Sequence, residues 1–499
     1  MSFIDSHTPV IVGTAQWTQP RGQQPGAEPL LVWETVCRRA AADAGISDRT
    51  LSMVDMLSIA NCMSWNYDDP VGRLAERLGA SPKSRSYEHP SGTSGHAALS
   101  AAATAIRGGH ADFSIICGGE MLATRKMYSL SGEVPPWSFP HSSARLFDLN
   151  QHQHPEEAAI GLFEGVGAVN SFAMRDIARR AHLGVDPQTY RQQLGELLAG
   201  MTEVAAKNPD AWFAQARSAD FLITPRPDNR MIAYPYTKHM VAMLEVDIAA
   251  ALIIMSEGRA NQLGISQEKR VYPWTGCYAQ DPVYIAVRDK LWKSDAMKAA
   301  ATATLEAANI SIDEVKYIDL YSCFASAINY SCDALGIDEV SGERVTITGG
   351  LPYAGGPASS YMYTSMNKLV ERLRQDPGSY GMSSGVGMMM SNHAFGLYST
   401  QPPEGIIHAD QKLIQSQLNA IPQKRIDTHY EGAVTLAAYT VMHDRTGEIS
   451  FGSAICDLPN GARAYARIFD KDLLREAEQS EMVGVKLNIY RKDFCAELG

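Results

Sequence analysis

Short apolar runs alternate with longer segments of helical periodicity through the first half of the chain. The runs are typical of buried β-strands. The segments between them carry helix signals, such as a proline at the start of 29–44 and Gly45 directly after its end. This alternation predicts helices layered on sheets, an α/β architecture. Strands are predicted at Pro9–Thr14, Val54–Ala60, Ser84–His89, Ala111–Gly119 and Leu244–Ser256, and helices at Pro29–Ala44 and Asp69–Leu78.

The most distinctive segment of this half is Ser91–Asp112, in which small residues precede an alanine-rich helix. Residues 91–95 are small enough for a tight turn. No charged side chain lies between His96 and Arg107, so we expect the helix to be buried on all sides. A turn of this kind can present a nucleophile at a helix N-terminus, and a plain strand-to-helix connection fits the segment as well.

The same pattern returns in the second half. Residues 345–356 (VTITGGLPYAGG) again lead through small residues into a predicted helix, Pro357–Leu373, which indicates a weak internal duplication. Further strands are predicted at Val271–Gly276 and at Val315–Tyr321, which runs into Ser322–Gly336. A helix is predicted at Ser294–Ala308 and a hairpin at Tyr380–Thr400.

Two segments depart from the alternation. Between Glu120 and Met243, aromatic and proline-rich loops accompany helical stretches at 156–180 and 187–207, and we interpret this segment as an insertion. After residue 403, Gly432–His443 and Glu448–Ile455 flank the turn sequence DRTG, and 482–490 resembles a final strand. The tail is therefore predicted to be a small all-β domain, a partly closed five-stranded barrel.

Composition narrows the function classes. The chain has 499 residues and a net charge of −11, which argues against general binding to nucleic acids or anionic membranes. Its longest apolar runs, such as 248–255, are too short to span a bilayer, and its first nine residues do not resemble a signal peptide. None of the eight cysteines forms a CxxC pair, so no zinc or redox motif is indicated. Scattered thiols in apolar contexts favour a cytoplasmic protein.

Four blocks, in their order, resemble the thiolase superfamily over roughly residues 8–400. They are RGGHAD (107–112), ADFSIICGGE (111–120), EVDIAAALIIMSE (245–257) and GGLPYAGGPASS (349–360). The resemblance implies a five-layered αβαβα fold of two duplicated halves, 1–265 and 266–403, with a loop domain inserted at about 120–243. With an OB-like barrel at 404–499, the arrangement is similar to that of the type 1 thiolase-like proteins. These are relatives of the sterol-carrier-protein-type thiolases in the acetyl-CoA acetyltransferase family.

The same resemblance identifies the positions where thiolases carry their catalytic groups. Thiolases use a nucleophilic cysteine, the histidine of a GHP motif, the first residue of an NEAF or HDCF motif, and a second cysteine. These positions fall on Gly92, Gly356 and Tyr321, and the last on Ser383 or Ser384. Glycine has no side chain to acylate, and a glycine at 356 provides no base. We therefore expect no thiolase activity.

Neighbouring side chains offer an alternative. Ser91, Thr93 and Ser94 surround the empty position and, with Tyr321 and His393, are expected to line a substrate pocket. A Ser94–His393 pair would make the protein an acyltransferase or hydrolase with a relocated hydroxyl nucleophile. We expect Tyr321 to fill the vacated volume rather than to act as an acid.

A coenzyme A ligand would, by the same resemblance, use the loop domain. Arg175, Arg179 and Arg226 are candidates to bind its ribose 3′-phosphate. Arg175 and Arg179 share a helix face at i, i+4 spacing, and a solvated helix surface is the simpler explanation of that pair.

We interpret the chain as a thiolase-like protein that binds an acyl-CoA, a related acyl ligand or a partner in lipid metabolism without thiolysis. The alternatives are the acyltransferase or hydrolase with a Ser/His pair, and a pure scaffold. We expect no metal and no cofactor other than a coenzyme A ligand. The C-terminal domain is expected to contact the thiolase core or a protein partner, and nucleic acid ranks last.

Overall fold

The first half is built on a five-stranded sheet in the order β1-β7-β4-β2-β3. The computed structural model describes residues 4–498 apart from 21, 23–24, 143–152, 163–167, 406–408 and 493–494. β1, β7 and β4 pair antiparallel, whereas β4, β2 and β3 run parallel. The strands are β1 (Pro9–Thr18), β2 (Met56–Ile59), β3 (Ser84–Tyr87), β4 (Phe113–Met121) and β7 (Asp247–Ser256), so all the predicted ones are present.

The second half repeats this arrangement in the order β8-β11-β10-β9. β8, β11 and β10 are antiparallel, and β10 and β9 are parallel, so the direction pattern of the first sheet recurs. Within the described residues this sheet has one strand fewer. The segment that follows α12 (Gly342–Val345) forms no strand beside β9, and the backbone there contributes one hydrogen bond of 2.9 Å, from the N–H of Leu320 to the carbonyl of Val345. The strands are β8 (Tyr272–Gln280), β9 (Val315–Asp319), β10 (Tyr380–Gly387) and β11 (Asn392–Ser399).

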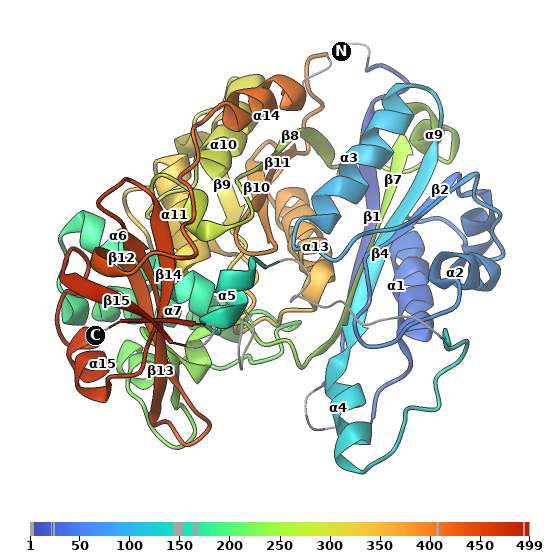
Figure 1. Ribbon diagram of the computed structural model, residues 1–499. Coiled ribbons are helices and arrows are strands. Elements are labelled where there is room, and N and C mark those ends of the chain that lie inside the picture. Colours follow the sequence, from blue (N-terminus) through green and yellow to red (C-terminus); the bar gives the residue numbers. More distant parts are fainter. Residues whose placement is uncertain are drawn as a thin grey trace.

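α3 and α13 (Tyr361–Gln375) lie between these two sheets. α1 (Pro29–Asp43) covers the outer face of the first sheet and α10 (Asp295–Ala308) that of the second, which gives the five-layered αβαβα fold (Figure 1). α3 (Ser94–Arg107) contacts β4 and β7 on one side and β8 on the other. Residues 97, 101 and 104 are exposed, so the expectation that α3 is buried on all sides is wrong. The other helices of the two halves are α2 (Pro70–Leu78), α4 (Leu122–Leu130), α9 (Glu257–Gln262) and α11 (Ala325–Leu335), together with α12.

The segment between β4 and β7 contains most of the helices outside the layered core. α7 (Pro187–Lys207) has the predicted bounds, with Pro187 at its start and Asp186 accepting the N–H of Thr189 as N-cap. The single helix expected over 156–180 is instead two, α5 (Pro155–Ala159) and α6 (Val169–Leu183), with 163–167 outside the described residues. α8 (Ala219–Ile223), β5 (Met231–Ala233) and β6 (Tyr236–Thr237) complete the segment.

The C-terminal strands form the expected OB-like barrel. β12 pairs with both β13 and β15, and β14 runs parallel to β16, which closes five strands on themselves. α15 lies between β14 and β15 in sequence, and α14 precedes the barrel. Neither helix was expected in an all-β tail, although Asp410 and Asp470 act as their N-caps. The elements are α14 (Gln411–Asn419), β12 (Gly432–His443), β13 (Ile449–Asp457), β14 (Arg463–Ile468), α15 (Lys471–Ala477), β15 (Lys486–Lys492) and β16 (Cys495–Leu498).

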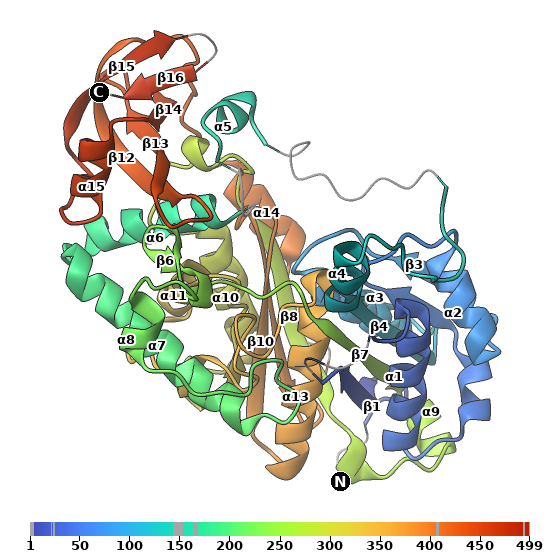
Figure 2. The ribbon, with the colours of Figure 1, turned by 90° about the horizontal axis from the view of Figure 1, so that it is seen from below.

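The barrel is joined to the rest of the chain rather than tethered beside it. It stands over α6 (Figure 2), and Met442 of β12 pairs with Ala233 of β5. Arg463 donates to the carbonyl of Asp289 at 2.9 Å, and the hydroxyl of Ser453 donates to the carbonyl of Ile160 at 2.8 Å. The expected contact between the C-terminal domain and the thiolase-like core is therefore present.

None of the described helices has the length and apolar character that a bilayer crossing would need. The seven cysteines whose side chains are described are free thiols, six of them buried and Cys323 half-buried.

Candidate functional site

The turn that enters α3 is held by its own hydroxyl groups. The hydroxyls of Ser91 and Thr93 lie 2.8 Å apart. Ser94 donates to the carbonyl oxygens of His89 and Ser91 at 2.9 and 2.8 Å. Thr93 and Ser94 are buried, and Ser91 is half-buried. The candidate hydroxyls of this turn therefore stabilise the turn itself.

Tyr321, which follows β9, occupies the space in front of Gly92. A Cβ atom added at Gly92 would lie 2.6 Å from Cζ and 2.7 Å from the hydroxyl oxygen of Tyr321, and it would overlap the carbonyl oxygen of Val386. Such approaches are far inside van der Waals contact, so no side chain fits at position 92 without movement of its neighbours. The Gly92 position is closed by the tyrosine ring.

Tyr321 is held by one contact to its ring and one to its backbone. It meets Tyr361 of α13 edge to face, with centroids 5.5 Å apart. Its backbone N–H donates to the hydroxyl of Ser384 at 2.8 Å. The side chain is 7% exposed, and burial raises the pKa of its phenol, so the hydroxyl stays protonated. Tyr321 thus has the space-filling position expected for it.

β10 supplies the wall opposite Gly92, but not through the residues singled out from sequence. A Cβ at Gly385 would lie 2.8 Å from the carbonyl oxygen of Gly92. Ser383 instead faces Tyr398, with hydroxyls 3.1 Å apart. The residues of β10 that lie against Gly92 are therefore Gly385 and Val386, which follow the expected positions Ser383 and Ser384.

Gly356 lies in the loop before α13 and offers no acid or base. Its N–H donates to the carbonyl of Met243 at 2.9 Å. An added Cβ would approach that oxygen to 3.2 Å and Leu351 to 3.4 Å, so the site is tight but not closed.

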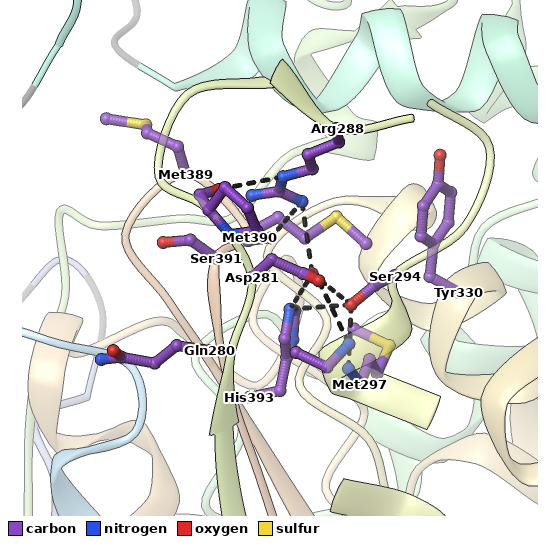
Figure 3. Close-up of polar contacts among 12 residues, drawn as sticks. Gln280, Asp281, Arg288, Ser294, Met297, Tyr330, Met389, Met390, Ser391 and His393 are labelled. Atoms are coloured by element: carbon purple, nitrogen blue, oxygen red, sulfur yellow. Dashed lines mark hydrogen bonds and ion pairs between the residues drawn. The ribbon is translucent and has the colours of Figure 1, made fainter. Parts of the chain in front are cut away.

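His393 belongs to a separate polar cluster at the N-terminus of α10 (Figure 3). Its Nε2 lies 3.1 Å from the hydroxyl of Ser294 and 3.2 Å from Oδ2 of Asp281. Ser294 donates to the same Oδ2 at 2.5 Å and accepts the N–H of Met297 at 2.9 Å as helix N-cap. Arg288 pairs with Asp281 at 3.4 Å. The Ser94–His393 pair considered above is absent, because each residue has different partners.

The charges of this cluster balance one another in a dry environment. Burial alone would raise the pKa of Asp281, but Arg288 and His393 lower it well below its usual range. Burial lowers the pKa of His393 against the opposing effect of Asp281. Among the described residues Nδ1 of His393 is buried without a hydrogen-bond partner. A serine–histidine–carboxylate triad needs the serine and the carboxylate on different ring nitrogens, whereas here both approach Nε2.

The three candidate arginines differ in their availability. Arg175 is 1% exposed and donates to the carbonyls of Ser171 and Met389 at 2.9 and 2.6 Å, and burial lowers its pKa to about 9. Arg179 is paired with both oxygens of Asp333 at 2.7 Å. A phosphate would have to displace these partners.

Arg226 is the least engaged of the three. It lies 4.0 Å from Asp220 and stacks over the ring of Phe221 at 4.5 Å. Arg217 stacks on the same ring at 4.4 Å. This second arginine was missed in the sequence, although its spacing from Phe221, four residues along, was a readable signal.

Known proteins resemble this chain in sequence and in fold. No family model matches the chain. A 3-ketoacyl-CoA thiolase of Escherichia coli is 27% identical over 185 residues, 36% of this chain. The match spans only 45% of that enzyme. A crystal structure of a monomeric SCP2-thiolase-like protein type 1 from Mycobacterium smegmatis superimposes with a TM-score of 0.85 and 28% identity over 100% of both chains. By sequence and fold, this chain is a thiolase-like protein.

A second solved structure is similar to this thiolase-like chain in fold alone. The structure named Ltp2–ChsH2(DUF35) aldolase superimposes with a TM-score of 0.58 and 16% identity, over 82% of this chain and 99% of that one. The likeness shows a shared fold. In this chain the two similar sheets and the OB-like barrel belong to one polypeptide.

Proposed function

We propose that this thiolase-like protein does not carry out thiolysis and instead binds an acyl-CoA, or a related acyl ligand of lipid metabolism, without cleaving it. The observation that carries the proposal is the closure of position 92 by Tyr321. A ping-pong acyl transfer needs a side-chain nucleophile at the end of the turn, and a Cβ there would collide with the tyrosine ring. Gly356 supplies no base to activate one.

A coenzyme A moiety would bind on the loop domain, at Phe221. Arg217 and Arg226 both lie over this ring, and neither forms a close ion pair among the described residues. Lys238 and Arg217 help burial to lower the pKa of the nearby His239, which indicates a positive local potential. Such a potential suits a phosphate. Arg175 and Arg179 are engaged with Met389 and Asp333, so we do not propose that they contact the ligand.

A hydrolase or acyltransferase is the second candidate, and the His393 cluster is what favours it. Ser294, His393 and Asp281 lie within hydrogen-bond distance of one another. The hydroxyl of Ser294 already donates to Asp281 and accepts a backbone N–H, and all three side chains are buried. These contacts support a helix-capping role for the cluster.

The barrel is the part of the chain that we propose for a protein partner. One of its faces is occupied by α6 and by the loop that contains Asp289. Tyr490 and Phe469 are exposed large side chains on the remainder. A DUF35 component in the name of a similar structure adds to this proposal.

Isothermal titration calorimetry with acetoacetyl-CoA tests the binding, and a thiolysis assay on the same sample tests the lack of turnover. We expect one binding site and no thiolysis above a buffer control. Arg226→Gln and Arg217→Gln should each weaken binding about tenfold, the effect of one lost charge-assisted phosphate contact. Arg49→Gln, which changes an exposed arginine of the first half, should bind as the unaltered chain does. Absence of binding, or binding indifferent to Arg226 and Arg217, would contradict the coenzyme A proposal.

A further inference from the structure

A cavity of about 740 Å³ runs along the flank of α3, away from the closed position at Gly92. Residues of α3, β8, β11 and the start of α14 line this cavity. The helix rises about 1.5 Å per residue, so Arg107 lies about 20 Å along α3 from the turn at Gly92. The volume is in the range of small-molecule sites.

At the base of the cavity, two glycines lie opposite each other on neighbouring strands. Gly276 of β8 pairs directly with Gly396 of β11. A Cβ at Gly276 would lie 2.5 Å from Cε1 of His96, and one at Gly396 would lie 2.8 Å from the hydroxyl oxygen of Tyr398. The absence of both side chains lets the rings of His96 and Tyr398 pack close to the strands.

Two polar side chains of α3, His96 and Arg107, line this cavity. Burial lowers the pKa of His96 to about 4, so its ring is neutral. Arg107 has one long contact, from Nη2 to the carbonyl of Pro273 at 3.5 Å, and forms no ion pair with any described residue. An arginine without a carboxylate partner beside an apolar wall suits a ligand that carries a negative charge.

The charges around the cavity favour a single negative charge. Arg107 and Lys412 are the cations of its lining, and Asp410 is its one carboxylate, already accepting the N–H of Leu413 at 3.0 Å. The net charge of about one positive unit suits a monocarboxylate better than a phosphate dianion, which Asp410 would repel. Leu99 and Ala103 add an apolar wall.

We propose that this cavity binds a monocarboxylate with an apolar body, such as the carboxylate of a medium-length acyl chain. Its carboxylate pairs with the guanidinium of Arg107, which presents parallel donors to two oxygens. The chain of the ligand lies against Leu99 and Ala103. The site is separate from the proposed coenzyme A site and does not depend on it.

Titration calorimetry with octanoate, and with octan-1-ol as its uncharged counterpart, tests the inference on the full chain. We expect octanoate to bind at one site with a Kd of about 1 mM or tighter. Octan-1-ol should bind at least about tenfold more weakly, because it has no charge for Arg107.

Variants locate the site. Arg107→Gln should weaken octanoate binding about tenfold or more, and Ser100→Leu, which fills the α3 wall, should abolish it. Arg372→Gln is the matched control, since it removes an exposed arginine from the last turn of α13. Thermal unfolding checks that each variant folds. If Ser100→Leu fails to fold, Arg107→Gln still tests the inference.

Octanoate that fails to bind, or that binds equally to Arg107→Gln and the unaltered chain, overturns the inference. Binding that is lost with Arg226→Gln but not with Arg107→Gln would place the carboxylate at the coenzyme A site instead. Loss of acetoacetyl-CoA binding alone would refute the proposed function and leave this site unaffected.

Discussion

Alanine at position 92 should destabilise the fold far more than alanine at position 356. The Cβ of Gly92→Ala overlaps the carbonyl oxygen of Val386 and lies 2.6 Å from Cζ of Tyr321. Overpacking of a buried site typically costs about 1–3 kcal/mol, and overlap with backbone places this change at the upper end. Reduced freedom of the unfolded chain returns about 0.4–1 kcal/mol. The net loss in free energy of unfolding is therefore about 2 kcal/mol.

Gly356→Ala is the matched control, because it has the same unfolded-state gain and milder contacts of 3.2–3.5 Å. Its stability should stay within about 1 kcal/mol of the unaltered chain. Urea unfolding followed by tryptophan fluorescence measures both, read as the midpoint of the first transition because the chain has several domains.

Tyr321→Ala separates the two sources of the clash. It is itself costly, by about 3–5 kcal/mol for a large buried aromatic. In its background Gly92→Ala should cost at least about 1 kcal/mol less than in the unaltered chain, the coupling expected of residues in contact. A Gly92→Ala variant as stable as the unaltered chain, or zero coupling, would refute the view that the ring closes this position.

Three further outcomes follow from buried polar groups. Burial raises the pKa of Glu120 from 4.5 to about 7, although the hydrogen bonds that it accepts oppose the shift. The protonated side chain therefore contributes its full stabilisation below pH 4.5, and this contribution is lost as the pH rises to 7. Because glutamine does not titrate, the urea midpoint of Glu120→Gln should fall less between about pH 5 and 8 than that of the unaltered chain. Asp281→Asn leaves Arg288 buried without its carboxylate and should cost about 3–5 kcal/mol in urea unfolding, with a smaller loss taken as evidence against the ion pair. Ser294→Ala removes an N-cap and should cost about 0.5–2 kcal/mol without changing any hydrolysis of p-nitrophenyl esters; a loss of such hydrolysis would support the hydrolase alternative.

Much of the fold was predictable because the local signals were strong. Proline at the start of a helix and glycine after its end located α1 and α2 to within a residue or two, and apolar runs located β4 and β7. The helices of the tail were missed because they are short and polar, with no residue of α14 buried.

The site was predictable in composition but not in its contacts. The order of sequence blocks indicated Gly92 and Tyr321, whereas the choice among Ser383, Ser384 and Gly385 depends on strand register. The partners of His393 come from positions 99 and 112 residues away, and no local pattern predicts such pairings. The cavity beside α3 includes a cross-strand glycine pair, which sequence spacing does not show.

The most direct test of the central claim is intact-protein mass spectrometry after incubation with acetoacetyl-CoA. A thiolase passes through an acyl-enzyme, so any relocated nucleophile would leave an acyl group on the chain. With position 92 closed by Tyr321, the account predicts the unmodified mass at every incubation time. An acetyl or acetoacetyl adduct that forms on the folded chain and maps to Ser91, Thr93, Ser94 or Ser294 would contradict it.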